Sequence, residues 1–114
     1  MIIYNITAVL EPSQLDSWEA FTPSFLKGLM NTNFFTSIKY CKIYAPSNEA
    51  PSFSIQCTTS SQERLLSFLE EHAQGFDQMV AEAFGDQVLL FKTTLEQIEH
   101  LSSSWSVSIK KVIK

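Results

Sequence analysis

Glycine is scarce in this chain of 114 residues, which contains only Gly28, Gly75 and Gly85. Because these three are isolated from one another, the chain has no glycine-rich loop that could hold a phosphate group with backbone amides. It also lacks the Gly-x-Ser-x-Gly turn that presents a nucleophilic serine in many hydrolases. No motif therefore indicates nucleotide binding or serine hydrolysis.

Cysteine and histidine are equally rare, with two residues of each. No two of them have the close spacing of a structural zinc site, so we expect no metal and no cofactor. The N-terminus carries no export signal, which predicts a protein of the reducing cytoplasm with two free thiols. No uninterrupted apolar run approaches the about 18 residues that a membrane helix needs, so we expect no membrane association.

Basic residues are in the minority, since 8 of them against 12 acidic residues give a net charge of −4. An acidic chain without an RNA-binding strand motif is not expected to bind nucleic acid. Aromatic residues are plentiful instead, with nine phenylalanines, three tyrosines and two tryptophans. A chain of this length forms one domain, and these large side chains must fill much of its core.

The sequence predicts four strands and two helices. Strand-like runs, either alternating or rich in aromatic and β-branched residues, cover residues 2–10, 34–45, 52–58 and 87–95. Apolar residues with helical spacing cover about residues 12–30 and 61–84. Pro23 removes a backbone hydrogen bond from the first helix, so we expect a kink near residues 20–22. The order β-α-β-β-α-β predicts a ferredoxin-like α+β fold, with both helices on one face of a four-stranded antiparallel sheet.

The second face of this sheet is predicted to be partly apolar. Its side chains are expected to be Ile3, Asn5, Thr7, Val9, Ile38, Tyr40, Ser54 and Gln56. A partly apolar sheet face usually has a partner, so we expect a second copy of the chain to pack on it and form a homodimer. The alternative is a sheet face that is simply solvated.

Five stretches together resemble a known family: MIIYNIT, FFTSIKYCKIY, SFSIQC, LEEHA and LLFKTTLE. They are similar to a bacterial family of domains of unknown function (DUF4286-like), whose members are dimeric α+β barrels. The resemblance covers about residues 1–98 and leaves 99–114 as a C-terminal extension. It implies a ferredoxin-like monomer whose sheet joins that of a second copy, and it implies no particular reaction. One departure is Phe21, which stands where relatives carry a histidine.

His72 is the candidate catalytic residue, because it lies at the centre of a predicted apolar helical stripe. The stripe consists of Leu65, Phe68, Leu69, His72, Phe76, Met79 and Ala83. In a structural role, His72 would be a buried, neutral and hydrogen-bonded imidazole. In a functional role it would be a general base or a ligand contact, but Glu70 and Glu71 are expected on the opposite side of the helix and could not orient it. The structural role is preferred.

Four residues are candidates for binding a flat apolar ligand: Trp18, Phe25, Phe35 and His72. Aromatic residues at such spacings more often belong to the core. The thiols of Cys41 and Cys57 are predicted to lie directly opposite one another on neighbouring strands if the hairpin turn centres near Glu49. We expect both to be buried packing residues without a redox role.

The C-terminal extension contains an amphipathic pattern, in which Trp105, Val107 and Ile109 alternate with serine and lysine. This pattern predicts an extra strand that pairs with a sheet edge, either of the same copy or of its partner. The alternative is a flexible tail that contacts anionic lipid or an acidic protein. Three lysines are too few to hold a protein on a membrane, so the added strand is favoured.

Two functions from different classes remain. The first is a non-catalytic binding or interaction module that acts as a homodimer. The second is a cofactor-independent oxygenase or isomerase that acts on a small hydrophobic substrate with His72 as its base. A pocket open to solvent beside His72 would favour the enzyme, whereas a fully packed His72 would favour the module.

Overall fold

The computed structural model describes residues 1–44 and 50–103. It contains four strands: β1 (Ile2–Leu10), β2 (Ser37–Ile43), β3 (Ser52–Thr59) and β4 (Val88–Glu96). The helices are α1 (Leu15–Asn31), α2 (Gln62–Phe68) and α3 (Gln74–Phe84), and a π-helical turn, η2 (Leu69–Ala73), joins the last two. Short 3-10 turns occupy Pro12–Gln14 and Gly85–Gln87. The predicted strand at 105–110 lies outside the described residues.

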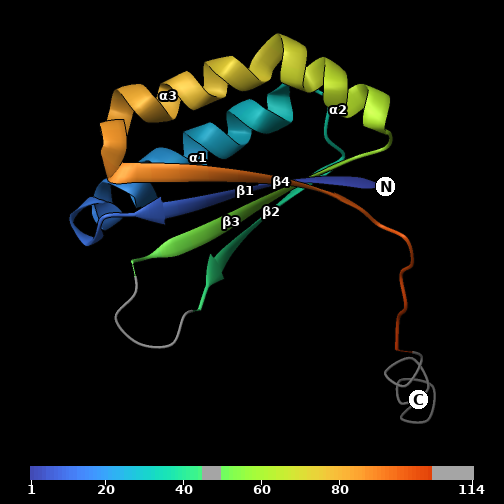
Figure 1. Cartoon of the computed structure of the whole chain (residues 1–114), viewed down its shortest axis with the longest axis horizontal. Helices are drawn as coiled ribbons and strands as arrows, with labels where there is room; N and C mark the ends of the chain where they lie inside the picture. The colour runs from blue at the N-terminus through green and yellow to red at the C-terminus, as the bar shows by residue number, and fades with distance from the viewer. Residues whose placement is uncertain (45–49, 104–114) are drawn as a thin grey trace, which may run out of the picture.

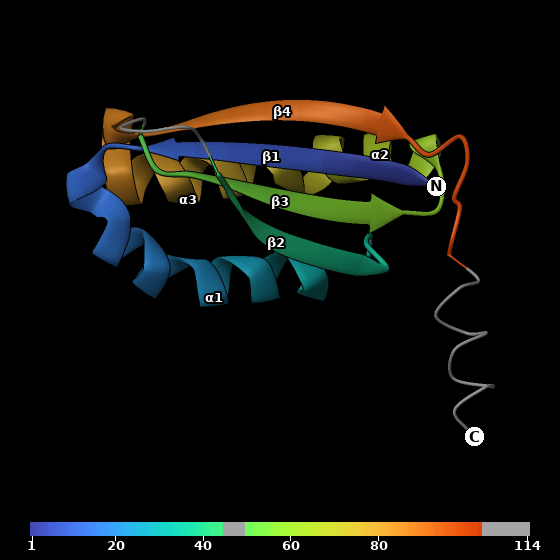
Figure 2. The same ribbon diagram turned by 90° about the horizontal axis from the view of Figure 1, so that it is seen from below.

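The strands form one antiparallel sheet in the order β2-β3-β1-β4. All the helices lie on one side of this sheet, and its other side is left uncovered by the described residues (Figures 1 and 2). The predicted ferredoxin-like α+β fold is therefore confirmed. The second strand begins at Ser37, later than predicted, since residues 34–36 are not part of the sheet ladder. Asn33 has a positive φ of 65° just after the end of α1.

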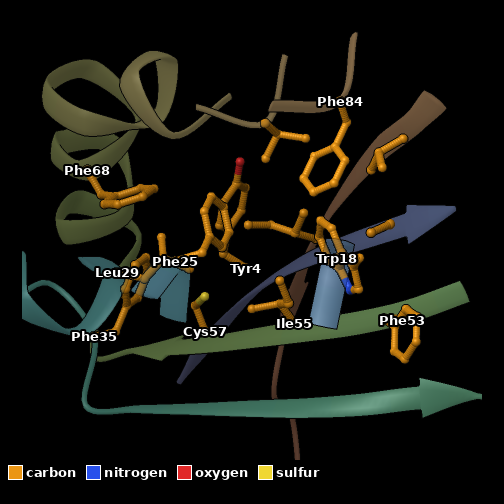
Figure 3. Packing of buried hydrophobic residues seen from close by; sticks show 14 of the residues in the cluster. Tyr4, Trp18, Phe25, Leu29, Phe35, Phe53, Ile55, Cys57, Phe68 and Phe84 are labelled. Atoms are coloured by element: carbon orange, nitrogen blue, oxygen red, sulfur yellow. The ribbon is translucent and has the colours of Figure 1, made fainter. Parts of the chain in front are cut away.

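The helix-facing side of the sheet carries the core. Alternate residues of β1 are buried from Ile2 to Leu10, as the period-two pattern predicted. In β3 the buried apolar residues are Phe53, Ile55 and Cys57, again as predicted. Large aromatic side chains from α1 and α2 fill the space above the two strands, and Figure 3 shows how closely they pack.

Helix α1 runs through Pro23 to Asn31 without interruption. A proline at position 23 cannot donate a backbone hydrogen bond to the carbonyl of Glu19. The hydroxyl of Thr22 donates to that same carbonyl at 3.4 Å. Thr22 is itself buried, so its side chain replaces the missing backbone donor without leaving an unpaired group in the core.

The second helix buries a different face from the predicted one after residue 73. Met79 is 41% exposed, whereas Val80 is only 2% exposed. Likewise Ala83 is exposed and Phe84 is buried. The cause is the π-helical turn: it inserts one extra residue into the helix and rotates all later side chains by about 100°. The predicted stripe assumed a regular helix and was therefore wrong by one position at its C-terminal end.

The register of β2 on β3 corrects two predictions. Ile38 and Tyr40 pair with Cys57 and Ile55, so both lie on the helix side of the sheet and not on its uncovered side. Cys41 pairs with Ser54 and not with Cys57, which is a difference of three residues from the expected register. Because three is odd, the two cysteines lie on opposite faces of the sheet.

Candidate functional site

The uncovered side of the sheet, called the open face below, combines side chains from all four strands. They are Ser37, Lys39, Cys41 and Ile43 of β2, Ser52, Ser54, Gln56 and Thr58 of β3, Ile3, Asn5, Thr7 and Val9 of β1, and Leu89, Phe91, Thr93 and Leu95 of β4. The residues of β1 and β3 lie where the sequence predicted them. The contribution of β4 was not predicted.

Strand β4 makes one side of the open face strongly apolar. Its residues Leu89, Phe91 and Leu95 are 51%, 55% and 46% exposed. In the pairing with β1, Leu89 is opposite Val9 and Leu95 is opposite Ile3. These five residues, with Thr93 between Phe91 and Leu95, make this side of the open face mainly apolar. The area is called the β4 strip below, and soluble proteins normally cover surfaces of this kind.

The centre of the open face is polar, and its polar groups bind one another. The hydroxyl of Ser54 donates to Oδ1 of Asn5 at 2.5 Å. The amide Nδ2 of Asn5 donates to the hydroxyl of Thr7 at 3.0 Å. Because these hydrogen bonds link neighbouring side chains within one sheet, another surface could cover them without leaving them unpaired.

His72 lies in the π-helical turn and is only partly buried. Its ring packs against Phe34 and Phe68, with centroid distances of 5.6 and 6.0 Å. Within the described part of the chain, no hydrogen bond is made by its imidazole, and so the expected buried and hydrogen-bonded histidine is wrong. Its contacts with the rings of Phe34 and Phe68 explain why His72 lies on the side of the helix that faces the aromatic side chains.

A shallow hollow of about 260 Å³ lies beside His72 and opens to solvent. Its lining comes from the π-helical turn and α3, and consists of Glu71, His72, Gly75, Phe76 and Met79. Glu71 therefore shares a surface with His72, whereas the sequence placed it on the opposite side of the helix. A general base needs a hydrogen-bonded group that orients its ring, and Glu71 makes no such bond.

The other three predicted ligand contacts fill the core. Trp18, Phe25 and Phe35 are all buried, and they line neither the hollow beside His72 nor the second one described below. Figure 3 shows them among the packed side chains between helices and sheet. They act as packing residues, which was the more common alternative at these spacings.

A second hollow, of about 290 Å³, lies between α3 and the outer edge of β4. It includes an ion pair between Lys92 and Asp77, whose side chains are 32% and 44% exposed. An ion pair with this exposure adds little stability. The carboxylate of Asp77 also acts on Tyr4 in the core. Burial is the main cause that raises the pKa of Tyr4 to about 12, and the negative charge of Asp77 is the second. No sequence signal indicated the ion pair of Lys92 and Asp77, because the two residues are 15 positions apart in different elements.

The metal-binding side chains and thiols of residues 1–44 and 50–103 are dispersed. No group of three or more metal-binding side chains occurs among them. Cys57 is buried, which raises the pKa of its thiol to about 12 and makes it a poor nucleophile at neutral pH. Cys41 is exposed on the open face, so the prediction that both cysteines are buried is wrong for this one. None of the helices in this part of the chain is long and apolar enough to cross a membrane.

The fold and the open face define a ferredoxin-like α+β domain with an uncovered, partly apolar sheet. The chain belongs to the family described as Domain of unknown function (DUF4286), whose model matches residues 1–98. The resemblance in the sequence is thereby confirmed. A similar solved structure is that of a dimeric ferredoxin-like protein from an uncultured marine organism. The two are 9% identical with a TM-score of 0.62, over 88% of this chain and 97% of that chain. No curated protein matches the sequence.

Proposed function

We propose that this chain is a non-catalytic interaction module that works as a homodimer, in which the open faces of two copies pack together. The observation that carries the proposal is the β4 strip, where three large apolar side chains are about half exposed beside Ile3 and Val9. Burying them against a second copy removes apolar surface from water twice, once for each copy.

The size of the open face is consistent with a specific interface. Four strands spaced about 4.8 Å apart, with about eight residues of 3.3 Å each, give a face of roughly 19 by 26 Å. Two such faces therefore cover about 1,000 Å² when they meet, which is near the lower limit for specific interfaces. The solved structure with the same fold, described as dimeric, supports this proposal.

The polar centre fits a dimer because it combines specificity with satisfied hydrogen bonds. Ser54, Asn5 and Thr7 already bond to one another, so packing leaves few polar groups unpaired. A polar centre beside an apolar strip also favours one relative orientation of the two sheets, since a shifted copy would place apolar side chains on polar ones. We further propose that the dimer works in the cytoplasm, where thiols such as Cys41 stay reduced.

The test is the oligomeric state of the full chain, measured by native mass spectrometry and light scattering over a range of concentrations. The variant Phe91→Lys places a charge in the β4 strip of each copy. Because the apolar contacts of Phe91 are lost in both copies, the dissociation constant of the dimer should rise at least about 100-fold. The control is Leu66→Lys, which changes an apolar residue of α2 that is 59% exposed on the helix side. A wild-type monomer, or equal weakening by both variants, would contradict the proposal.

A second candidate function, a cofactor-independent oxygenase or isomerase, is favoured by one observation. The hollow beside His72 is open to solvent and includes Phe76 and Met79, so a small hydrophobic molecule could bind there. Native mass spectrometry of the freshly purified protein tests this as well. A bound molecule that is lost in the variant Met79→Lys would show that the hollow holds a ligand. Turnover of that molecule, lost in His72→Gln, would support the second function over the first.

A further inference from the structure

Strand β4 forms one edge of the sheet. It is nine residues long, and its outer backbone groups have no neighbouring strand within the described residues. Its Leu89, Phe91 and Leu95 add an exposed apolar surface to that edge. Long apolar edges promote uncontrolled strand pairing, and proteins normally protect them with charge, a bulge or a covering segment.

The chain beyond β4 leads away from the helices. Gln97 still donates a backbone hydrogen bond to the carbonyl of Met1 at 2.9 Å. Beyond it, residues 98–103 leave the sheet toward the side of the open face (Figure 1), and they pass the end of the sheet without turning back along β4 (Figure 2). Ile98 and Leu101 on this segment are 92% and 84% exposed. The extension therefore presents apolar residues on the side where a second copy would pack.

We propose that residues 105–110 of each copy pair as an added strand with the outer edge of β4 in the other copy. This inference rests on the proposed homodimer and names the segment that covers its exposed edge. Trp105, Val107 and Ile109 alternate with polar residues, as in a strand with one apolar face. An exchanged segment would also extend the interface beyond the two sheets and so strengthen a small dimer.

The extension is long enough to reach the other copy. Residues 97–104 separate the end of β4 from Trp105, and eight residues span up to about 27 Å when extended. Two packed sheets lie about 10 Å apart, and a four-stranded sheet is about 14 Å wide between its outer strands. The added strand would lie one further spacing of about 4.8 Å beyond β4, so a path across both distances is about 22 Å, which the eight residues can cover.

An antiparallel pairing with Val107 opposite Thr93 explains the apolar alternation. It places the apolar side chains of the segment on the open face, where they widen the β4 strip in three pairs: Trp105 with Leu95, Val107 with Thr93, and Ile109 with Phe91. The same register brings the basic end of the segment, residues 110–114, to the beginning of β4. Exposed carboxylates of Glu82 and Asp86 precede that strand, so the charges are complementary.

The other edge of the sheet fits the segment less well. Strand β2 carries Lys39 and Lys42 within its seven residues, and lysines on an edge strand discourage further pairing. They would also repel the lysines of the extension. The side chains of β2 on the open face are Ser37, Lys39, Cys41 and Ile43, and only Ile43 among them is a large apolar residue.

Cross-linking of the full chain between engineered cysteines tests the inference. The background variant is Cys41→Ser, which removes the exposed thiol and keeps the buried Cys57. The test pair is Thr93→Cys with Val107→Cys, and the matched control pair is Lys39→Cys with Val107→Cys on the opposite edge. Native mass spectrometry of each unoxidised protein first gives its oligomeric state, and mild oxidation followed by a non-reducing gel then gives the linkage.

We expect the test pair to form a covalent dimer in most of the protein and the control pair to form little. A disulfide within one chain would overturn the exchange between copies, because the segment would then cover its own edge. Linkage through position 39, or none at either position, would overturn the choice of β4. A non-covalent dimer without the expected link contradicts this inference alone, whereas a monomer without the link contradicts the proposed homodimer as well.

Discussion

The indole N–H of Trp18 donates a hydrogen bond of 2.8 Å to the hydroxyl of Tyr40, and this bond joins α1 to the edge strand β2. Trp18 is fully buried, while the ring of Tyr40 stacks on Phe53 at a centroid distance of 5.6 Å. The bond gives a buried donor its acceptor and fixes the helix over the edge of the sheet.

Removal of the Tyr40 hydroxyl should therefore destabilise the protein. In Tyr40→Phe the indole N–H of Trp18 is left unpaired in the core, and we expect a loss of about 1–3 kcal/mol in the free energy of unfolding. Urea denaturation measures it. The control Tyr44→Phe removes a hydroxyl from a side chain that is 87% exposed and should change stability by less than about 0.5 kcal/mol. Equal effects of the two variants would contradict this role of the bond.

Two buried acids should make the fold sensitive to alkaline pH. Burial raises the pKa of Tyr4 from 10.0 to about 12 and that of Cys57 from 9.0 to about 12. The folded protein then keeps protons that the unfolded chain releases, so stability is full below pH 9 and falls as the pH rises toward 12. Denaturation between pH 7 and pH 11 should show this fall. Tyr4→Phe and Cys57→Ala should each reduce its slope.

The rates at which the two thiols react should show whether the open face is covered. Cys41 is exposed there. It lies in one row across the sheet with Ser54, Thr7 and Phe91, which pair in that order. In a dimer packed through this face, Cys41 should react slowly with a thiol reagent. The reaction should become faster on dilution and in the monomeric variant Phe91→Lys. Cys57 should react only after unfolding. A rate for Cys41 that is independent of concentration and of Phe91 would place the interface elsewhere.

Loss of the imidazole of His72 should cost little stability. His72→Gln removes ring contacts with Phe34 and Phe68 but no hydrogen bond, so we expect a change of about 1 kcal/mol or less. For comparison, Phe68→Ala removes a buried ring and should cost about 3–5 kcal/mol. Thermal and urea denaturation of both variants measure the difference. A loss of more than 2 kcal/mol in His72→Gln would show that the ring has a larger structural role than these contacts imply.

Gly85 and Gly75 should respond in opposite directions to alanine. Gly85 ends α3 with a φ of 58°, a conformation that side chains with a Cβ rarely adopt. Gly85→Ala should therefore cost about 1–3 kcal/mol. Gly75 lies in helical α3 with nothing within 4 Å of an added Cβ, so Gly75→Ala should stabilise by about 0.5–1 kcal/mol. Denaturation curves of the pair check both signs.

Local periodicity was sufficient to predict the elements and the main core. The alternation of β1 and β3 depends only on which side chains face the helices, and the structure buries Tyr4 and Ile55 as expected. The start of β2 at Ser37 was less accessible, because residues 34–36 have a strand-like composition but do not pair as a strand. Composition alone does not show where pairing begins.

Features that depend on pairing between distant segments could not be predicted in the same way. The register of β2 on β3 is set through the connecting turn, and a shift of three residues moved Tyr40 to the helix side and separated the two cysteines. The apolar residues Leu89 and Phe91 were visible in the sequence. Their position beside Val9 and Thr7, however, follows only from the pairing of β4 with β1.

The π-helical turn also affects how the length of this chain can vary. It adds one residue between the buried pair Leu65 and Phe68 and the buried pair Val80 and Phe84. Deletion of one residue within 69–73 would convert the turn into regular helix and leave both buried pairs on the same face. A deletion inside either buried pair would turn one of its members away from the sheet. Relatives of different length should therefore tolerate a one-residue gap between Phe68 and Val80, and not within either pair.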